Sequence, residues 1–306
     1  MAQEKTTADI SAGIGISIKK HSFISRISVI LRAILQNFNG KIGVVFIAAL
    51  VIFAVFSPWI APYHPYEQDI PSRFAGPSFK HLLGTDYLGR DILSRLIYGS
   101  RIAVVVSFGS VCLSAIAGVI LGVTAGYKEG KKFDYMVIWL FDVVRSFPQI
   151  ILALAIVAVL GPSLTNLIIA LAFTAFPFYG RVARAQTLTI KDTNYVKAAE
   201  ALGAANTRII FKHIIPNILS PVIVLVGMDM ATMIMYEAGL SFLGLGVRPP
   251  TASWGIMLRK GYTYIEASPW MIIWPSIAIA VAMIGFSLFS ESMRIALSPK
   301  ERDIGG

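Results

Sequence analysis

Residues 194–217 read NYVKAAEALGAANTRIIFKHIIPN, a charged and alanine-rich stretch between two long apolar parts of the chain. No Asp, Glu, Lys or Arg occurs in residues 146–180 before it or in residues 218–228 directly after it. A helix needs about 20 mostly apolar residues to cross a membrane, and uncharged segments supply them. We therefore expect residues 194–217 to form a water-facing loop between two membrane-spanning helices.

The composition of the whole chain also indicates a membrane protein. Its 306 residues are 56% hydrophobic and 14% charged, and the mean hydropathy is +0.69. A soluble domain carries about 25% charged residues, so this chain has too few to cover a water-facing surface. The single cysteine, Cys112, cannot form an internal disulfide, and the four scattered histidines lack metal-site spacing. The predicted fold class is all-α, a polytopic membrane protein with no metal site.

Six segments are long and apolar enough to span the membrane. They lie near residues 42–60, 102–127, 135–160, 164–180, 218–236 and 267–290. The sequence GPS at 161–163 separates the third span from the fourth. The other predicted parts are an extracytoplasmic loop at 61–101, a core at 102–292 that contains a loop at 185–216, and tails at 1–41 and 293–306.

The distribution of positive charge predicts the orientation of the six transmembrane helices. An even number of spans places both termini on one side, and most of the 27 Lys and Arg residues lie in segments on that side. Positive residues accumulate in the cytoplasm, so we expect both termini there, and the net charge of +10 needs no nucleic acid as a partner. Residues 22–38 place apolar side chains on one helical face, which predicts a helix lying on membrane lipid or, alternatively, a longer first span.

A ridge of small side chains follows the second span. Ser110, Ser114, Gly118, Gly122 and Gly126 recur every four residues and therefore share one helical face. Small residues allow two helices in a membrane to approach closely. The pattern predicts helix packing, with a ligand groove as the alternative.

The 194–217 stretch itself has the features of a docking element. On a helix, its small apolar residues form one shallow surface; they are Ala198, Ala199, Ala201, Leu202 and Ala205. Gly203 permits a turn between two short helices, and Pro216 marks the point where the chain re-enters the membrane. The surface fits a groove on a cytoplasmic protein. An amphipathic helix resting on its own bundle is the other interpretation.

Two segments of this stretch resemble a known signature. KAAEALG at 197–203 and HIIP at 213–216 are similar to the coupling-helix signature of ABC importer permeases, E-A-A-x-x-x-G followed by I-x-L-P. Lys197 replaces the Glu of the signature and Ile215 replaces its Leu. The resemblance implies that Ala198, Ala199, Glu200, Gly203 and Pro216 couple this chain to an ATPase.

Further segments resemble the dipeptide/oligopeptide branch of that family, which also contains nickel permeases. They are HLLGTDYLGRDILSRLIYGSR at 81–101, LSFLGLGVRPPTASWGIML at 240–258 and MRIALSPK at 293–300. The layout resembles the second, shorter permease of the pair. The resemblance implies the fold of an ABC type I importer permease in a bacterial or archaeal cytoplasmic membrane. It also implies a second permease, two ATP-binding subunits that hold ATP and Mg, and an extracytoplasmic substrate-binding protein.

Charged residues within the spans are candidates for the substrate pathway, because such charges are expensive in lipid. Asp142 and Arg145 are three residues apart, so they either pair with each other or face a cavity, where Arg145 pairs with a peptide carboxylate. Asp229 and Glu237 are candidates for contacting a peptide amino group, with structural pairing as the alternative.

Other functions find less support in the sequence. No phosphate-binding loop, H-E-x-x-H or G-x-S-x-G motif is present, so the chain is not expected to be an enzyme or to bind a cofactor. A channel would need a repeated pore motif or a ring of like charge. Within the resembling family, nickel, glutathione and opines remain alternatives to a di- or oligopeptide substrate.

Overall fold

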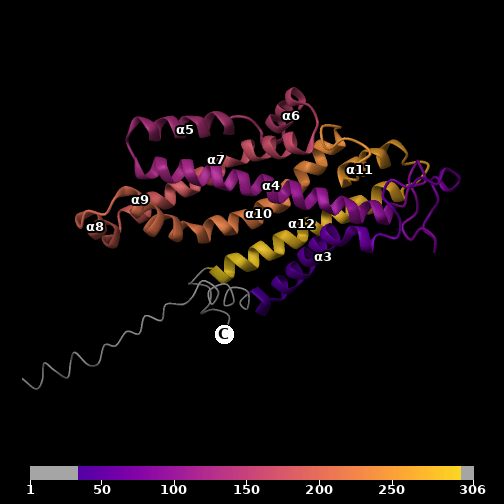
Figure 1. Cartoon of the computed structure of the whole chain (residues 1–306), viewed down its shortest axis with the longest axis horizontal. Helices are drawn as coiled ribbons and strands as arrows, with labels where there is room; N and C mark the ends of the chain where they lie inside the picture. The colour runs from indigo at the N-terminus through magenta and orange to yellow at the C-terminus, as the bar shows by residue number, and fades with distance from the viewer. Residues whose placement is uncertain (1–33, 298–306) are drawn as a thin grey trace, which may run out of the picture.

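The computed structural model describes residues 34–297, and this part of the chain is helical (Figure 1). The long helices are α3 (Phe38–Ile60), α4 (Ile92–Tyr127), α7 (Leu164–Lys191), α10 (Ile215–Phe242) and α12 (Trp270–Leu297). The shorter ones are η1 (Ile70–Ser72), α5 (Lys132–Arg145), α6 (Gln149–Leu160), α8 (Asn194–Ala201), α9 (Asn206–Ile209), the π-helical segment Ile210–Ile214 and α11 (Trp254–Thr263). Within residues 34–297 no β-strand occurs, which confirms the all-α prediction.

Five helices of the described region are long and apolar enough to cross a membrane, and a sixth span exists if α5 and α6 together count as one. Helices α5 and α6 meet at an angle of 88°. The continuous third span predicted over 135–160 is therefore wrong in shape. Pro148 explains the break, because it has no N–H to donate and disfavours helical backbone in the residue before it.

Two helices extend beyond their predicted spans. Helix α4 begins at Ile92, because the carboxylate of Asp91 accepts a hydrogen bond from the Ser94 amide and caps the helix. The last ten residues of the predicted 61–101 loop are thus helical. Helix α7 continues to Lys191, so the loop predicted from 185 begins later. The predicted surface helix at 22–38 and the tail after 297 lie wholly or mostly outside the described residues.

Helices α4 and α7 form the centre of the bundle and lie side by side along most of their length (Figure 1). The small-residue ridge of α4 faces α7. A Cβ atom on Gly122 would collide with the carbonyl of Gly180, and one on Gly126 would lie 2.9 Å from the Cβ of Thr187. The backbones can approach this closely only because the ridge lacks side chains. Helices α5 and α6 pack on one side of this pair, and α10, α12 and α3 pack on the other.

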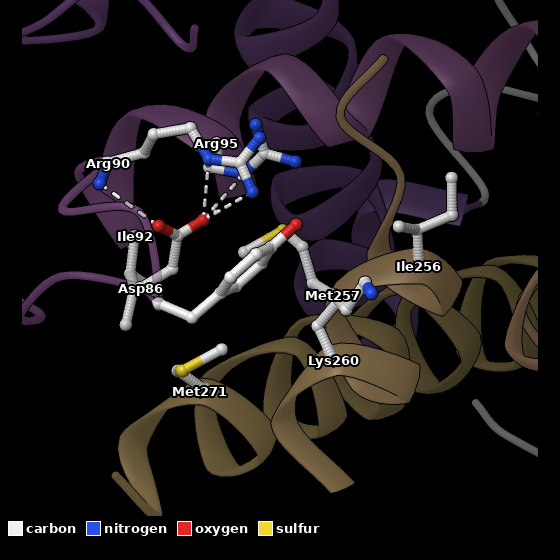
Figure 2. A pocket seen from close by; sticks show the side chains of 9 residues that line it. Asp86, Arg90, Ile92, Arg95, Ile256, Met257, Lys260 and Met271 are labelled. Atoms are coloured by element: carbon white, nitrogen blue, oxygen red, sulfur yellow. Dashed lines mark hydrogen bonds and ion pairs between the residues drawn. The ribbon is translucent and has the colours of Figure 1, made fainter. Parts of the chain in front are cut away.

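The segment between α3 and α4 folds over one end of the bundle, and α8 and α9 lie at the opposite end (Figure 1). A buried ion cluster anchors the segment to α4. Asp86 accepts a 2.7 Å hydrogen bond from Arg90, and Arg95 lies 3.7 Å from the same carboxylate oxygen. Figure 2 shows that both guanidinium groups point toward Asp86, with Lys260 of α11 and Met271 of α12 on the opposite wall. The cluster therefore joins this segment to α4, beside a pocket that α11 and α12 also line.

Candidate functional site

One candidate site is the α8–α9 segment, and Val196 attaches its first helix, α8, to the bundle. Val196 is fully buried among apolar side chains of neighbouring helices. They include Val123 of α4, Ala183 and Ile190 of α7, and Ile209, Ile214 and Ile218 further along the chain. This single buried side chain fixes which face of α8 points toward the bundle.

The alanine surface of α8 lies on the other face. Ala198, Ala201 and Ala205 are exposed, Ala199 is half-buried, and Leu202 is 89% exposed. Helix α8 does rest on its own bundle through Val196, but Ala198, Ala201 and Ala205 lie away from that contact. A smooth apolar surface that remains open to solvent is suited to contact with another protein.

The turn after α8 depends on Gly203, whose φ of +79° lies in the left-handed region that favours glycine. The Gly203 amide donates to the Glu200 carbonyl at 2.9 Å, and the Ala204 amide donates to the Ala199 carbonyl at 3.0 Å. These two bonds define a Schellman motif, which ends a helix and satisfies its last carbonyl groups. The turn predicted at Gly203 is present.

The side chain of Tyr127 holds the segment on both sides of this turn. The hydroxyl of Tyr127, the last residue of α4, lies 2.9 Å from Asn206 Oδ1 and 3.3 Å from Glu200 Oε1. Lys191, the last residue of α7, pairs with Glu129 at 2.5 Å and so joins the end of α7 to the turn after α4. Glu200 therefore contacts its own bundle rather than extending the alanine surface.

Pro216 does not begin a new helix, because the helix is continuous from Asn206 to Phe242. It lies in the first turn of α10, directly after the π-helical segment Ile210–Ile214. Since proline has no N–H, the carbonyl of Lys212 has no partner four residues ahead. The wider π turn accommodates this gap, so α9 is joined to a membrane-spanning helix without a flexible loop.

A second candidate site is a cavity at the break between α5 and α6. Its volume is about 240 Å³, and its charged lining residues are Arg145 at the end of α5 and Asp229 on α10. The other lining residues are Val144, Phe147, Gln149, Thr174, Ala175 and Phe178. The Arg145 guanidinium lies 5.9 Å from the centroid of the Phe178 ring, which holds it by a cation–π interaction. Two of the four pathway candidates thus meet in one cavity.

The other two pathway candidates have structural partners. Asp142 forms an ion pair with Arg181 of α7, so the mutual pair expected between Asp142 and Arg145 is wrong. The reason is that α7 passes beside α5 and presents its own arginine to this face. Glu237 is 1% exposed and accepts hydrogen bonds from Ser241 at 2.8 Å and Ser253 at 2.9 Å. The bond to Ser253 links α10 to the residue directly before α11.

Sequence reasoning also missed the ion pair between Asp134 and Arg184. Arg184 of α7 donates two hydrogen bonds to Asp134 of α5, at 2.7 and 2.8 Å. Both residues were placed near loops, and no short-range pattern joins positions 134 and 184. Within residues 34–297 no group of three or more His, Cys, Asp or Glu side chains is arranged to hold a metal ion.

Comparison with known proteins adds two family matches and several relatives. Residues 118–303 match the binding-protein-dependent transport system inner membrane component family, and residues 25–77 match the N-terminal TM domain of oligopeptide transport permease C. The chain is 39% identical over 265 residues to the dipeptide transport system permease protein DppC of Alkalihalophilus pseudofirmus, covering 87% of each chain.

Two further relatives match over most of their length. The di/tripeptide transport system permease protein DppC of Pseudomonas aeruginosa is 39% identical, over 84% of this chain and 87% of that protein. The glutathione transport system permease protein GsiD of Escherichia coli is 38% identical, over 83% of this chain and 84% of that protein.

Proposed function

The chain belongs to the family of binding-protein-dependent transport system inner membrane components, and from this premise we propose that it carries peptides through an ATP-driven importer. It is a multi-pass membrane permease subunit and not an enzyme. The peptide assignment rests on the names of the relatives, of which the dipeptide and di/tripeptide permeases match over more than four fifths of this chain. A bacterial cytoplasmic membrane is the location that the same relatives favour.

The exposed alanine surface of α8 is the observation that supports coupling to an ATPase. It is apolar, it stands at one end of the bundle, and Val196 and the turn at Gly203 hold it in place. We assign Ala198, Ala199, Gly203 and Pro216 to the coupling element, with Glu200 as the residue that ties it to α4. In this assignment the α8 end of the bundle and both termini face the cytoplasm.

The continuity of the helix from Asn206 to Phe242 supplies a mechanism. An ATPase that moves on binding ATP would carry α8 and α9 with it. Because no flexible loop separates α9 from α10, the movement reaches the membrane as a tilt of α10, which lines the cavity through Asp229. The machine in this proposal needs two ATP-binding subunits with ATP and Mg, a second permease, and an extracytoplasmic substrate-binding protein.

The coupling assignment is tested by a bulky side chain at Gly203. Gly203 and Gly130 both have a positive φ, +79° and +74°, and a Cβ atom at either position meets nothing within 4 Å. Gly203→Trp and Gly130→Trp therefore impose the same kind of backbone strain, but only the first adds bulk beside the alanine surface. We expect Gly203→Trp to abolish uptake or release the ATPases, and Gly130→Trp to affect both far less. Equal behaviour of the two variants would contradict the assignment.

The substrate is tested by uptake in cells that lack this chain and in cells that carry it. Labelled di- and oligopeptides are compared with nickel and glutathione, because a glutathione permease is among the relatives. Loss of peptide uptake alone supports the proposal. Loss of glutathione uptake alone makes glutathione the substrate, and loss of nickel uptake alone assigns the chain to metal transport. Co-purification of ATPases and a second permease tests the partners.

A further inference from the structure

The cavity at the α5–α6 break contains one positive and one negative side chain that do not neutralise each other. Arg145 and Asp229 both line it, and no ion pair joins either of them to another residue of the described part of the chain. Asp229 is half-buried and Arg145 is exposed. A charge within a membrane-spanning segment normally pairs with another group or faces a water-filled cavity. An unpaired cation and an unpaired anion in one cavity therefore indicate a ligand that carries both charges.

The place of the cavity in the fold also suits a ligand. It lies where a span is broken by 88°, and broken helices are tolerated at membrane depth where they line a cavity. Gln149 at the start of α6 and Thr174 of α7 add polar groups to the lining, and Phe147 and Phe178 add aromatic walls. A few polar groups set among apolar walls are typical of small-molecule sites.

The size of the cavity limits the ligand. Its volume of about 240 Å³ is slightly below the roughly 300–1,000 Å³ of common ligand sites. The two charged ends of a fully extended dipeptide are about 7 Å apart, so a dipeptide spans such a cavity and a long peptide does not fit as a compact whole.

We propose that Arg145 and Asp229 form a contact site for the two ends of a dipeptide within the membrane, Arg145 binding the α-carboxylate and Asp229 the α-ammonium group. The inference rests on the proposed function and extends it, because it assigns part of substrate selection to the permease itself. Arginine suits the first role, since its planar guanidinium donates two parallel hydrogen bonds to a carboxylate. Phe178 stacks on that guanidinium and fixes its position.

The site is tested by direct binding to the complete transporter, purified in lipid nanodiscs without its binding protein and without ATP. The probe is radiolabelled Ala-Ala. We expect Arg145→Gln and Asp229→Asn each to weaken its binding about ten-fold, as expected for loss of a charge-assisted hydrogen bond. Arg145→Lys should retain part of the affinity. The matched control is Arg73→Gln, an exposed arginine outside the membrane helices, which should bind like the wild type.

A second test uses the wild-type complex and measures how well analogues of Ala-Ala compete with the labelled dipeptide. Ala-Ala amide lacks the carboxylate, and N-acetyl-Ala-Ala lacks the ammonium group. Each should compete about ten-fold more weakly than Ala-Ala. Because two changes to one contact are not additive, the amide should lose no further affinity in Arg145→Gln. Free alanine, with both charges on one residue, should compete at least about ten-fold more weakly as well.

Several results would overturn the inference and leave the proposed function intact. They are normal peptide uptake by cells combined with no Ala-Ala binding to the purified complex, equal competition by the amide and the free peptide, or wild-type affinity in a fully assembled Arg145→Gln complex. Equal competition by alanine would make the site one for single amino acids. Absence of peptide uptake by wild-type cells would instead remove the proposed function and the inference together.

Discussion

Two ion pairs join α5 to α7, and their different burial predicts different contributions to stability. In the first pair Asp134 is 2% exposed and Arg184 is 23% exposed. In the second, Asp142 is 57% exposed and Arg181 is 47% exposed. Both pairs join the same two helices through an aspartate and an arginine, and they differ in burial and in the number of hydrogen bonds that the carboxylate accepts.

The loss in the free energy of unfolding expected for Asp134→Asn follows from the contacts that this variant removes. The carboxylate accepts two hydrogen bonds from Arg184 and one, at 3.1 Å, from the Gly130 amide. The variant removes the counter-charge and leaves the guanidinium largely enclosed. Breaking a fully buried pair costs about 3–5 kcal/mol. Because Arg184 keeps some contact with solvent, we expect about 2–3 kcal/mol here. For Asp142→Asn, an exposed pair, we expect at most about 1 kcal/mol.

The assay is reversible unfolding of the purified protein in mixed micelles by SDS, followed through the fluorescence of its five tryptophans. The free energy of unfolding is compared for the wild type, Asp134→Asn, Asp142→Asn and the double variant. The two pairs share no residue, so the single losses should add in the double variant. Equal losses for Asp134→Asn and Asp142→Asn would refute the reasoning, because burial and the additional hydrogen bonds of Asp134 would then not decide the contribution.

Three further predictions concern other parts of the chain. Gly122→Val should prevent assembly of the bundle, because the new side chain collides with a backbone carbonyl of α7. Gly109→Ala should be tolerated, because its Cβ meets only a side chain, at 3.4 Å. Size-exclusion chromatography distinguishes an assembled variant from an unassembled one. Glu237→Ala should destabilise the protein by about 1–3 kcal/mol by leaving two buried serine hydroxyls unpaired, and Glu237→Gln should cost less because it keeps an acceptor oxygen; similar SDS midpoints for both would contradict this. Hydrogen bonds from the Ser72 hydroxyl and from the Lys80 ammonium lower the pKa of Asp69. The contact between Asp69 and Lys80 is therefore fully present above the ordinary aspartate pKa of 3.8, and it is lost as the pH falls through the lowered pKa of Asp69. Lys80→Met should raise the titration midpoint of Asp69 in carbon-13 NMR, and an unchanged midpoint would count against the contact.

Some features of the candidate sites follow from local sequence patterns, and others depend on how the helices pack. The turn at Gly203 was predictable, because a glycine between two short helical patterns is a local signal. The exposure of Ala198 and Ala201 was not, since an alanine surface has the same sequence whether it faces solvent or its own bundle. Val196 decides between these orientations, and its burial depends on side chains from three other helices.

The partners of the charged residues were the least predictable feature. Spacing alone suggested that Asp142 and Arg145 pair with each other, as i,i+3 neighbours on one helix do. In the structure Asp142 pairs with Arg181, about 40 residues further along the chain. Arg145 shares a cavity with Asp229 instead. Such distant partners are set by how α5, α7 and α10 pack, and no local spacing encodes that.

The sequence by itself determined the all-helical membrane fold and the family, because long apolar runs and specific motifs are properties of short segments. It also determined where α4 meets another helix, since the small-residue ridge from Ser110 to Gly126 is a local repeat. Only the tertiary structure decided the face of α8 that remains exposed and the meeting of Arg145 with Asp229. The physical reason is that these features arise from contacts between helices far apart in the chain, where packing and charge pairing choose among arrangements that the local sequence permits equally.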